Sequence, residues 1–174
     1  MKVSPMIPTQ AHIGTRITAL RAPIDEGYSI PTKPPAAFWT VDAHDNDAIE
    51  RLITHIGVDD TTHHTLVPVR IPEPKIFDLS DIHQLWNQLK KWRFIPLATK
   101  PDSDKRAMIT QIQMTFVQHS DEIWDTIAQM YDAVRLTSHP SAPGFLNRMG
   151  WDIPSTAWFR PQDSLQLTNV RSHY

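Results

Sequence analysis

The chain has 174 residues, a length that predicts a single domain over 1–174 with one hydrophobic core. Hydrophobic residues make up 40% of the chain and charged residues 21%, which excludes a disordered or fibrous protein. The formal net charge of -2 provides no global basic field for nucleic acid, and the absence of cysteine excludes disulfides, Cys-ligated zinc and a thiol nucleophile.

The chain also lacks the apolar segments that would direct it to a membrane. Its first residues contain no continuous apolar run of the length that a signal peptide requires. No stretch approaches the roughly 18 apolar residues that a transmembrane helix needs. We therefore expect a cytoplasmic protein that does not span a membrane.

The first predicted elements are a strand over 37–41, a helix that starts behind Asp45 and ends before Gly57, and a strand over 65–71. Both strands are rich in β-branched or aromatic residues. In the helix, apolar residues recur at steps of three and four from Ile49 onward, which is the spacing of one helix face.

The clearest helix is predicted behind Ser80 or Asp81, either of which is a favourable N-cap. Ile82 opens an apolar repeat at steps of three and four, and basic residues follow at the end where they stabilise the helix dipole. Two further helices are expected over 104–118 and from Ser120 onward, and the two are nearly continuous.

Three short strands are predicted in the last third of the chain, over 133–136, 156–160 and 165–167. Strands near both ends with helices between them argue against a regular alternation of strand and helix. We therefore expect an α+β domain rather than a doubly wound sheet.

Several common active-site patterns are absent from the chain, including the glycine-rich nucleotide loops and the HExxH zinc motif. Of nine histidines, His55, His63 and His64 lie close in sequence and His83 follows, so a metal site is one interpretation. The adjacent His63 and His64 would point to opposite faces of an extended segment. We therefore predict that they lie on a solvated surface, and we assign no metal site.

Single residues leave further interpretations open. Ser155 with His12 as a base suggests a hydrolase, but the chain has no GxSxG elbow. Trp39 precedes Thr40 and a polar segment, so its ring either packs in the core or stacks on a flat ligand. Arg16 is suited to bidentate hydrogen bonds with phosphate, although an exposed arginine is usually only solvated.

Four segments resemble, in order, the ADP-ribosyltransferase-like fold of diphtheria-type toxins, poly-ADP-ribose polymerases and many phage or bacterial effectors. HIGT at 12–15 is similar to the family's His-Gly-Thr first strand, with Ile13 inserted. FWT at 38–40 is similar to the second motif, in which an aromatic residue, usually Tyr, precedes a small hydroxyl residue. The third segment, 67–71 leading into 77–81, resembles the middle strand and the entry to the helix after it. The fourth, 130–134 together with 155–161, resembles the closing turn and the terminal strand.

The resemblance spans most of the chain and implies both a fold and a reaction. The fold would be a single α+β domain of split antiparallel or mixed sheets with intervening helices. In the reaction, nicotinamide leaves NAD and the ribose carbon passes through a cation-like state before a nucleophile captures it. NAD is thus the implied substrate, and the implied acceptor is a protein or a nucleic acid.

The resemblance also implies residue roles. His12 would hydrogen-bond a ribose hydroxyl, and Thr15 or Arg16 would assist with ribose or phosphate. Trp39 would stack on the nicotinamide, with Thr40 beside it.

At the third motif the sequence departs from the family pattern. The family usually carries Glu there, whereas this chain has Ser155 or Thr156, and Asp152 is the only nearby carboxylate. Electrostatic stabilisation of the developing cation needs such a charge. By resemblance, Asp152 and His12 are the expected catalytic residues and Ser155 belongs to the cofactor site.

By resemblance, the leading hypothesis is a mono-ADP-ribosyltransferase of toxin, effector or phage type, with an inhibitory protein among its expected partners. The alternative is a catalytically inert interaction protein that binds a host or partner protein. Its support is the missing Glu and the many aromatic and proline residues available for a surface. A hydrolase or metal enzyme built on the histidines ranks below both.

Overall fold

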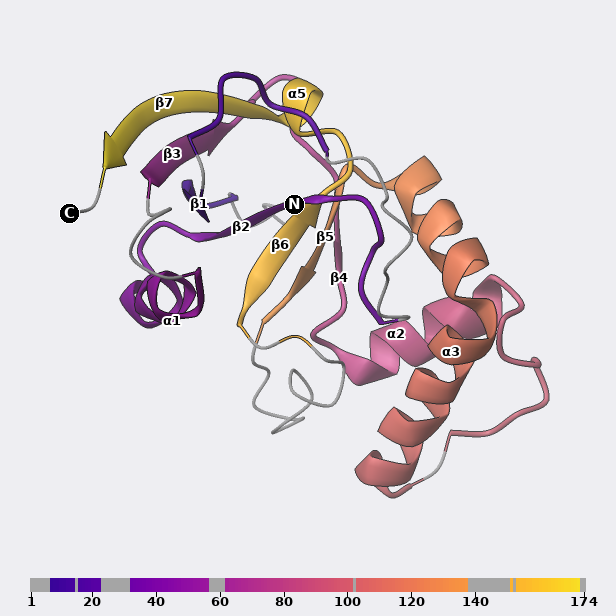
Figure 1. Cartoon of the computed structure of the whole chain (residues 1–174). Helices are drawn as coiled ribbons and strands as arrows, with labels where there is room; N and C mark the ends of the chain where they lie inside the picture. Colours follow the sequence, from indigo (N-terminus) through magenta and orange to yellow (C-terminus); the bar gives the residue numbers. More distant parts are fainter. Residues whose placement is uncertain are drawn as a thin grey trace, which may run out of the picture.

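A mixed sheet of seven strands runs through the part of the chain that the computed structural model describes, which is 7–14, 16–22, 32–56, 62–101, 103–137, 151 and 153–172 (Figure 1). The strands are β1 (Gln10–Gly14), β2 (Phe38–Asp42), β3 (Thr62–Pro68), β4 (Ile76–Asp78), β5 (Ala133–Leu136), β6 (Ser155–Trp158) and β7 (Leu165–Ser172). Their order across the sheet is β4-β5-β6-β2-β1-β3-β7, and only β4 and β5 pair in parallel.

The helices of the described residues are α1 (Asn46–Ile56), α2 (Ile82–Lys91), α3 (Lys105–Met130) and the short α5 (Pro161–Ser164). Figure 1 shows α2 and α3 together at the β4 and β5 end of the sheet, while α1 lies apart beside β1 and β2. The expectation of an α+β domain with a mixed sheet is confirmed.

The helices form where capping and apolar spacing predict them. Asp81 caps α2 by accepting hydrogen bonds from the backbone N–H groups of His83 and Gln84, at 3.0 and 3.2 Å. The two helices expected around residue 119 are joined in α3, with non-helical backbone angles at His119. The predicted break is therefore a kink inside one long helix.

The strands agree less closely with the sequence prediction. The strand over 133–136 matches β5, and the other predicted strands overlap β2, β3, β6 and β7 with ends shifted by a few residues. The resemblance alone pointed to β1. β4 was not among the predicted strands, because three residues carry too little periodicity to be recognised.

The two faces of the sheet carry different cores. Side chains alternate along β2, so Trp39 packs against the cluster beneath α2 and α3, whereas Phe38 points to the other face. There Phe38 joins Leu66 and Trp158, and Ile17 and Leu20 cover them. We call residues 16–22 the strap, because this segment lies across that second face.

The prediction that His63 and His64 lie on a solvated surface is wrong. Both residues belong to β3, which pairs with β1 on one side and β7 on the other. Their side chains are buried, with exposed fractions of 8% for His63 and 0% for His64. The histidines do point to opposite faces, but each of those faces is covered.

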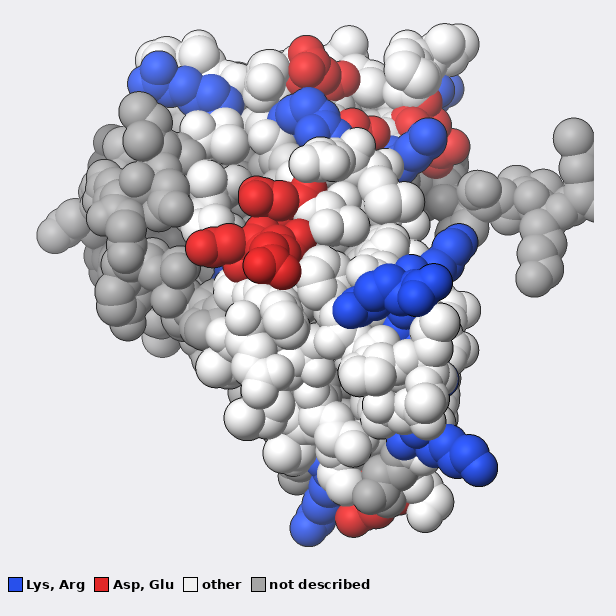
Figure 2. Space-filling view, turned by 90° about the vertical axis from the view of Figure 1, so that its right-hand side faces the viewer, with Lys and Arg blue, Asp and Glu red and all other residues white. Residues whose placement is uncertain are grey.

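Charged side chains are dispersed over the helical side of the molecule. Figure 2 shows small separate groups of acidic and basic residues on that side, in keeping with the net charge of -2. Within the described ranges, none of the helices has the length and apolar character needed to cross a bilayer.

Candidate functional site

His12 is held in one orientation by two consecutive residues of β2. Its Nδ1 lies 2.7 Å from the carbonyl oxygen of Trp39, and its ring stacks on Phe38 with centroids 4.4 Å apart. A carbonyl only accepts hydrogen bonds, so Nδ1 carries the proton and donates it. The lone pair of the neutral imidazole is therefore on Nε2.

The Nε2 atom of His12 is left available. It makes no hydrogen bond with a residue in the described ranges, and a Cβ at Gly14 would lie 3.3 Å from it. Because that distance is tighter than ordinary van der Waals contact, the missing side chain of Gly14 keeps open the space beside Nε2.

Burial keeps His12 neutral. Desolvation lowers the pKa of His12 below the ordinary 6.5, and the nearby His64 acts in the same direction, while the hydrogen bond to Trp39 opposes them. At neutral pH His12 therefore presents an acceptor with a fixed direction. Such a group can orient a hydroxyl or act as a general base.

Thr40 belongs to a buried relay of hydrogen bonds. The indole Nε1 of Trp158 donates to the Thr40 hydroxyl at 2.7 Å, and this hydroxyl donates to Oε1 of Gln10 at 2.6 Å. The Gln10 amide in turn donates to the carbonyl of Pro8 at 2.9 Å. The Thr40 side chain is thus used inside the protein, with an exposed fraction of 1%.

Trp39 does not share a site with His12. Its indole packs edge-on against Trp151, with centroids 4.9 Å apart, and the Lys33 ammonium lies 5.8 Å from the ring centroid. The ring of His12 stacks instead on Phe38, which faces the other side of β2. The two rings therefore lie on opposite faces of the sheet and do not flank a common ligand in this structure.

The remaining predicted site residues are more dispersed. Arg16 is exposed at the start of the strap. Ser155 opens β6, and its hydroxyl donates to the carbonyl of Ile153 at 2.9 Å. Thr15 and Asp152 lie outside the described residues. The strands that carry the site residues, β1, β2 and β6, are nonetheless adjacent at the centre of the sheet.

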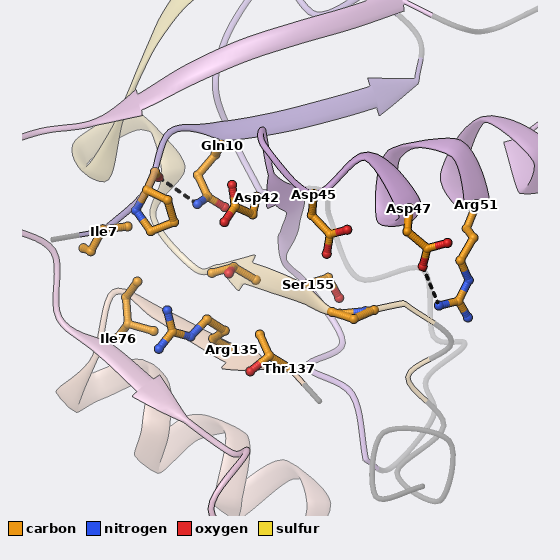
Figure 3. Close-up of a pocket in the computed structure, with 13 residues that line it drawn as sticks. Ile7, Gln10, Asp42, Asp45, Asp47, Arg51, Ile76, Arg135, Thr137 and Ser155 are labelled. Carbon is orange, nitrogen blue, oxygen red and sulfur yellow. Dashed lines mark hydrogen bonds and ion pairs between the residues drawn. The ribbon is translucent and has the colours of Figure 1, made fainter. Parts of the chain in front are cut away.

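An open pocket of about 360 Å³ lies where β1 begins and β2 ends, beside the start of β6 (Figure 3). Figure 3 shows carboxylates along one side of it, with Arg135 on the other side. The polar lining includes Gln10, Asp42, Asp45, Arg135, Thr137 and Ser155. Apart from Ser155, none of these residues was expected from the sequence to belong to a site.

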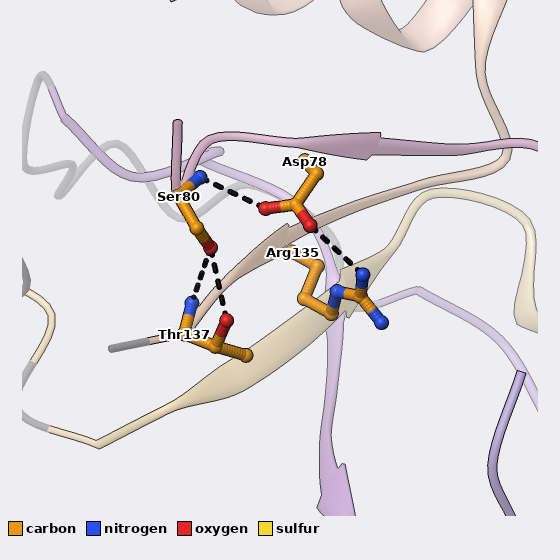
Figure 4. Close-up of polar contacts among 4 residues, drawn as sticks. All are labelled: Asp78, Ser80, Arg135 and Thr137. Carbon is orange, nitrogen blue, oxygen red and sulfur yellow. Dashed lines mark hydrogen bonds and ion pairs between the residues drawn. The ribbon is translucent and has the colours of Figure 1, made fainter. Parts of the chain in front are cut away.

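Arg135 is held in place by Asp78 of β4, which is itself oriented by Ser80 (Figure 4). Its Nη2 donates to Asp78 at 2.8 Å, and Asp78 accepts the backbone N–H of Ser80 at 2.8 Å. Burial acts to raise the pKa of Asp78, but hydrogen bonds from Ser80 and Arg135 outweigh it, so this pKa is lowered. Ser80 also bonds Thr137, which ties the ends of β4 and β5 together.

No metal centre emerges from the part of the chain that the structure describes, because no three His, Asp, Glu or Cys side chains there gather closely enough to hold an ion. Comparisons with protein-family models, curated proteins and solved structures return no match for this chain.

Proposed function

We propose that the protein binds NAD and transfers its ADP-ribosyl group to a protein or nucleic-acid acceptor. The observation that carries the proposal is the oriented, neutral imidazole of His12, with Nε2 free of partners among the described residues. The resemblance of the segments at 12–15, 38–40 and 155–161 supports it, since residues 12–14, 38–40 and 155–158 of these segments lie on the adjacent strands β1, β2 and β6.

In the proposed reaction, the bond between the ribose carbon and the nicotinamide nitrogen breaks, and the electron pair leaves with nicotinamide. The acceptor nucleophile then bonds to the ribose carbon and loses its proton to solvent or to a base. His12 Nε2 accepts a hydrogen bond from a ribose hydroxyl and so positions the sugar. Asp152 is the carboxylate proposed to stabilise the cation-like carbon.

The test measures nicotinamide release from NAD by chromatography, with NAD binding followed by saturation-transfer NMR. His12→Asn keeps a side-chain donor for the Trp39 carbonyl but removes Nε2, so we expect the fold to survive and release to fall by about 100-fold. His83→Asn, on the exposed side of α2, is the matched control. Unchanged turnover in His12→Asn would refute the role of His12.

A second candidate function is a catalytically inert interaction protein. It is favoured by the position of Trp39, which packs on Trp151 away from His12, and by the buried use of the Thr40 hydroxyl. This function predicts that the wild-type protein neither binds nor consumes NAD. Absence of both signals in the folded protein would therefore select it over the enzyme.

A further inference from the structure

The strap is connected to the sheet through one buried histidine. The backbone N–H of Ile17 donates to Nε2 of His64 at 3.0 Å. This hydrogen bond joins the strap directly to β3. Ile17 and Leu20 add apolar contacts with the cluster around Phe38.

The hydrogen bonds of His64 with His12 and Ile17 require a single protonation state. Its Nδ1 lies 3.3 Å from the carbonyl oxygen of His12, which can only accept, so Nδ1 carries a proton. Its Nε2 accepts from Ile17 and therefore carries none. A second proton on the ring would place two N–H groups against each other and remove the bond to the strap.

The charged and titratable groups around His64 also oppose its protonation. Burial lowers the pKa of His64 most, and Arg16, at the start of the strap, lowers it further. The backbone hydrogen bonds with His12 and Thr62 act in the opposite direction but do not outweigh them. The ring of His12 lies 5.6 Å away on β1, and its protonation would add a second positive charge. On β7, Val170 pairs with His64, and Arg171 pairs instead with His63, whose side chain points to the opposite face.

We propose that the strap is a pH-sensitive cover, closed by neutral His64 and released when His64 takes up a proton. Release uncovers the apolar surface around Phe38, on the face that carries His12. The proposal goes beyond the proposed reaction and stands without it, since it depends only on the bonds of His64.

The first test uses the wild-type protein labelled with nitrogen-15. We expect the nitrogen-15 chemical shifts of the His64 ring at neutral pH to be those of a neutral ring protonated at Nδ1. The chemical shift of the Ile17 amide should change with pH together with those of the ring. Hydrogen exchange of the strap amides, corrected for the intrinsic exchange rate, should accelerate as the pH falls through the titration of His64. The expected acceleration is about tenfold for each pH unit, because opening takes up one proton. Amides of α2 serve as the internal control.

Two variants distinguish local opening of the strap from a general loss of stability. His64→Gln keeps an acceptor for Ile17 that does not titrate, so strap exchange should lose its pH dependence. His12→Asn leaves His64 in place, so strap opening should persist even if NAD turnover is lost. If the Ile17 amide does not titrate with His64, or strap exchange follows that of α2, the proposal is wrong.

Discussion

The imidazole of His12 lies on the ring of Phe38 with the planes 22° apart. The next residue of β2, Trp39, offers its carbonyl to the same imidazole. One strand thus fixes both the plane and the rotation of a side chain on its neighbour. This arrangement pre-organises Nε2 before any ligand arrives, which reduces the entropy lost on binding.

Replacing Gly14 with alanine should impair the site more than the fold. The new Cβ would lie 3.3 Å from Nε2 of His12, so it would crowd the space where the proposed ribose hydroxyl would bind. We expect Gly14→Ala to lower nicotinamide release by about tenfold with a small change in melting temperature. In a His12→Asn background the same change should add little, and an equal additional loss would show that Gly14 acts elsewhere.

Replacing Thr40 with valine should destabilise the centre of the sheet. The change keeps the shape of the side chain but leaves Trp158 Nε1 and Gln10 Oε1 without a partner. We expect a loss of about 1–3 kcal/mol in the free energy of unfolding, measured in urea. Thr126→Val on the exposed side of α3 is the control, and the relay has no structural role if both variants lose the same amount.

Replacing Asp81 with alanine should weaken the start of α2. Two backbone N–H groups would lose their side-chain acceptor, at a cost of about 0.5–2 kcal/mol in unfolding free energy. Asp125→Ala, on an exposed position of α3, should change stability by less than about 0.5 kcal/mol. Equal stability of the two variants would contradict the capping role.

Stability should fall as the pH drops below the ordinary histidine pKa of 6.5. The folded-state pKa values of His12 and His64 are lowered, so the unfolded chain takes up protons first. Their contribution is present above 6.5 and is lost as the pH falls through the folded values. Urea unfolding of the wild-type protein across this pH range should show that the free energy of unfolding falls with pH. A His12→Asn/His64→Gln double variant should lack this dependence.

The ion pair of Asp78 and Arg135 should contribute at higher pH and fade in acid. The pKa of Asp78 is lowered in the folded state, so its stabilising effect is present above the unfolded pKa and is lost as the pH falls through the folded one. We expect Asp78→Asn to cost about 1 kcal/mol at neutral pH, since the pair is partly solvated. Asp47→Asn, whose carboxylate is 81% exposed beside Arg51, should cost less.

The helices were predictable because the residues that specify each helix lie within it or next to it in the sequence. Asp81 as a cap and the apolar repeat from Ile82 defined α2, and the break expected before Ser120 corresponds to the kink at His119. Strand β4 was not predictable in this way, because its pairing with β5 depends on residues more than fifty positions away.

The candidate site was predictable only in part. A histidine on β1 was expected, but its orientation depends on a carbonyl and a ring from β2 that no motif encodes. The pocket with Arg135 was missed for the same reason, since its lining comes from residues 7 to 156. Asp42 and Asp45 follow Trp39 closely in the sequence, but no sequence pattern predicts that they lie across the pocket from Arg135.

The position of β6 has a consequence for how the chain folds during synthesis. β6 lies between β2 and β5, yet it follows all of β1 to β5 along the chain. A nascent chain that has not reached Ser155 therefore holds two separate groups of strands with unpaired edges. Pairing across such long separations is slow, and open edges invite other chains to pair, so this interval is when the protein most needs protection by chaperones.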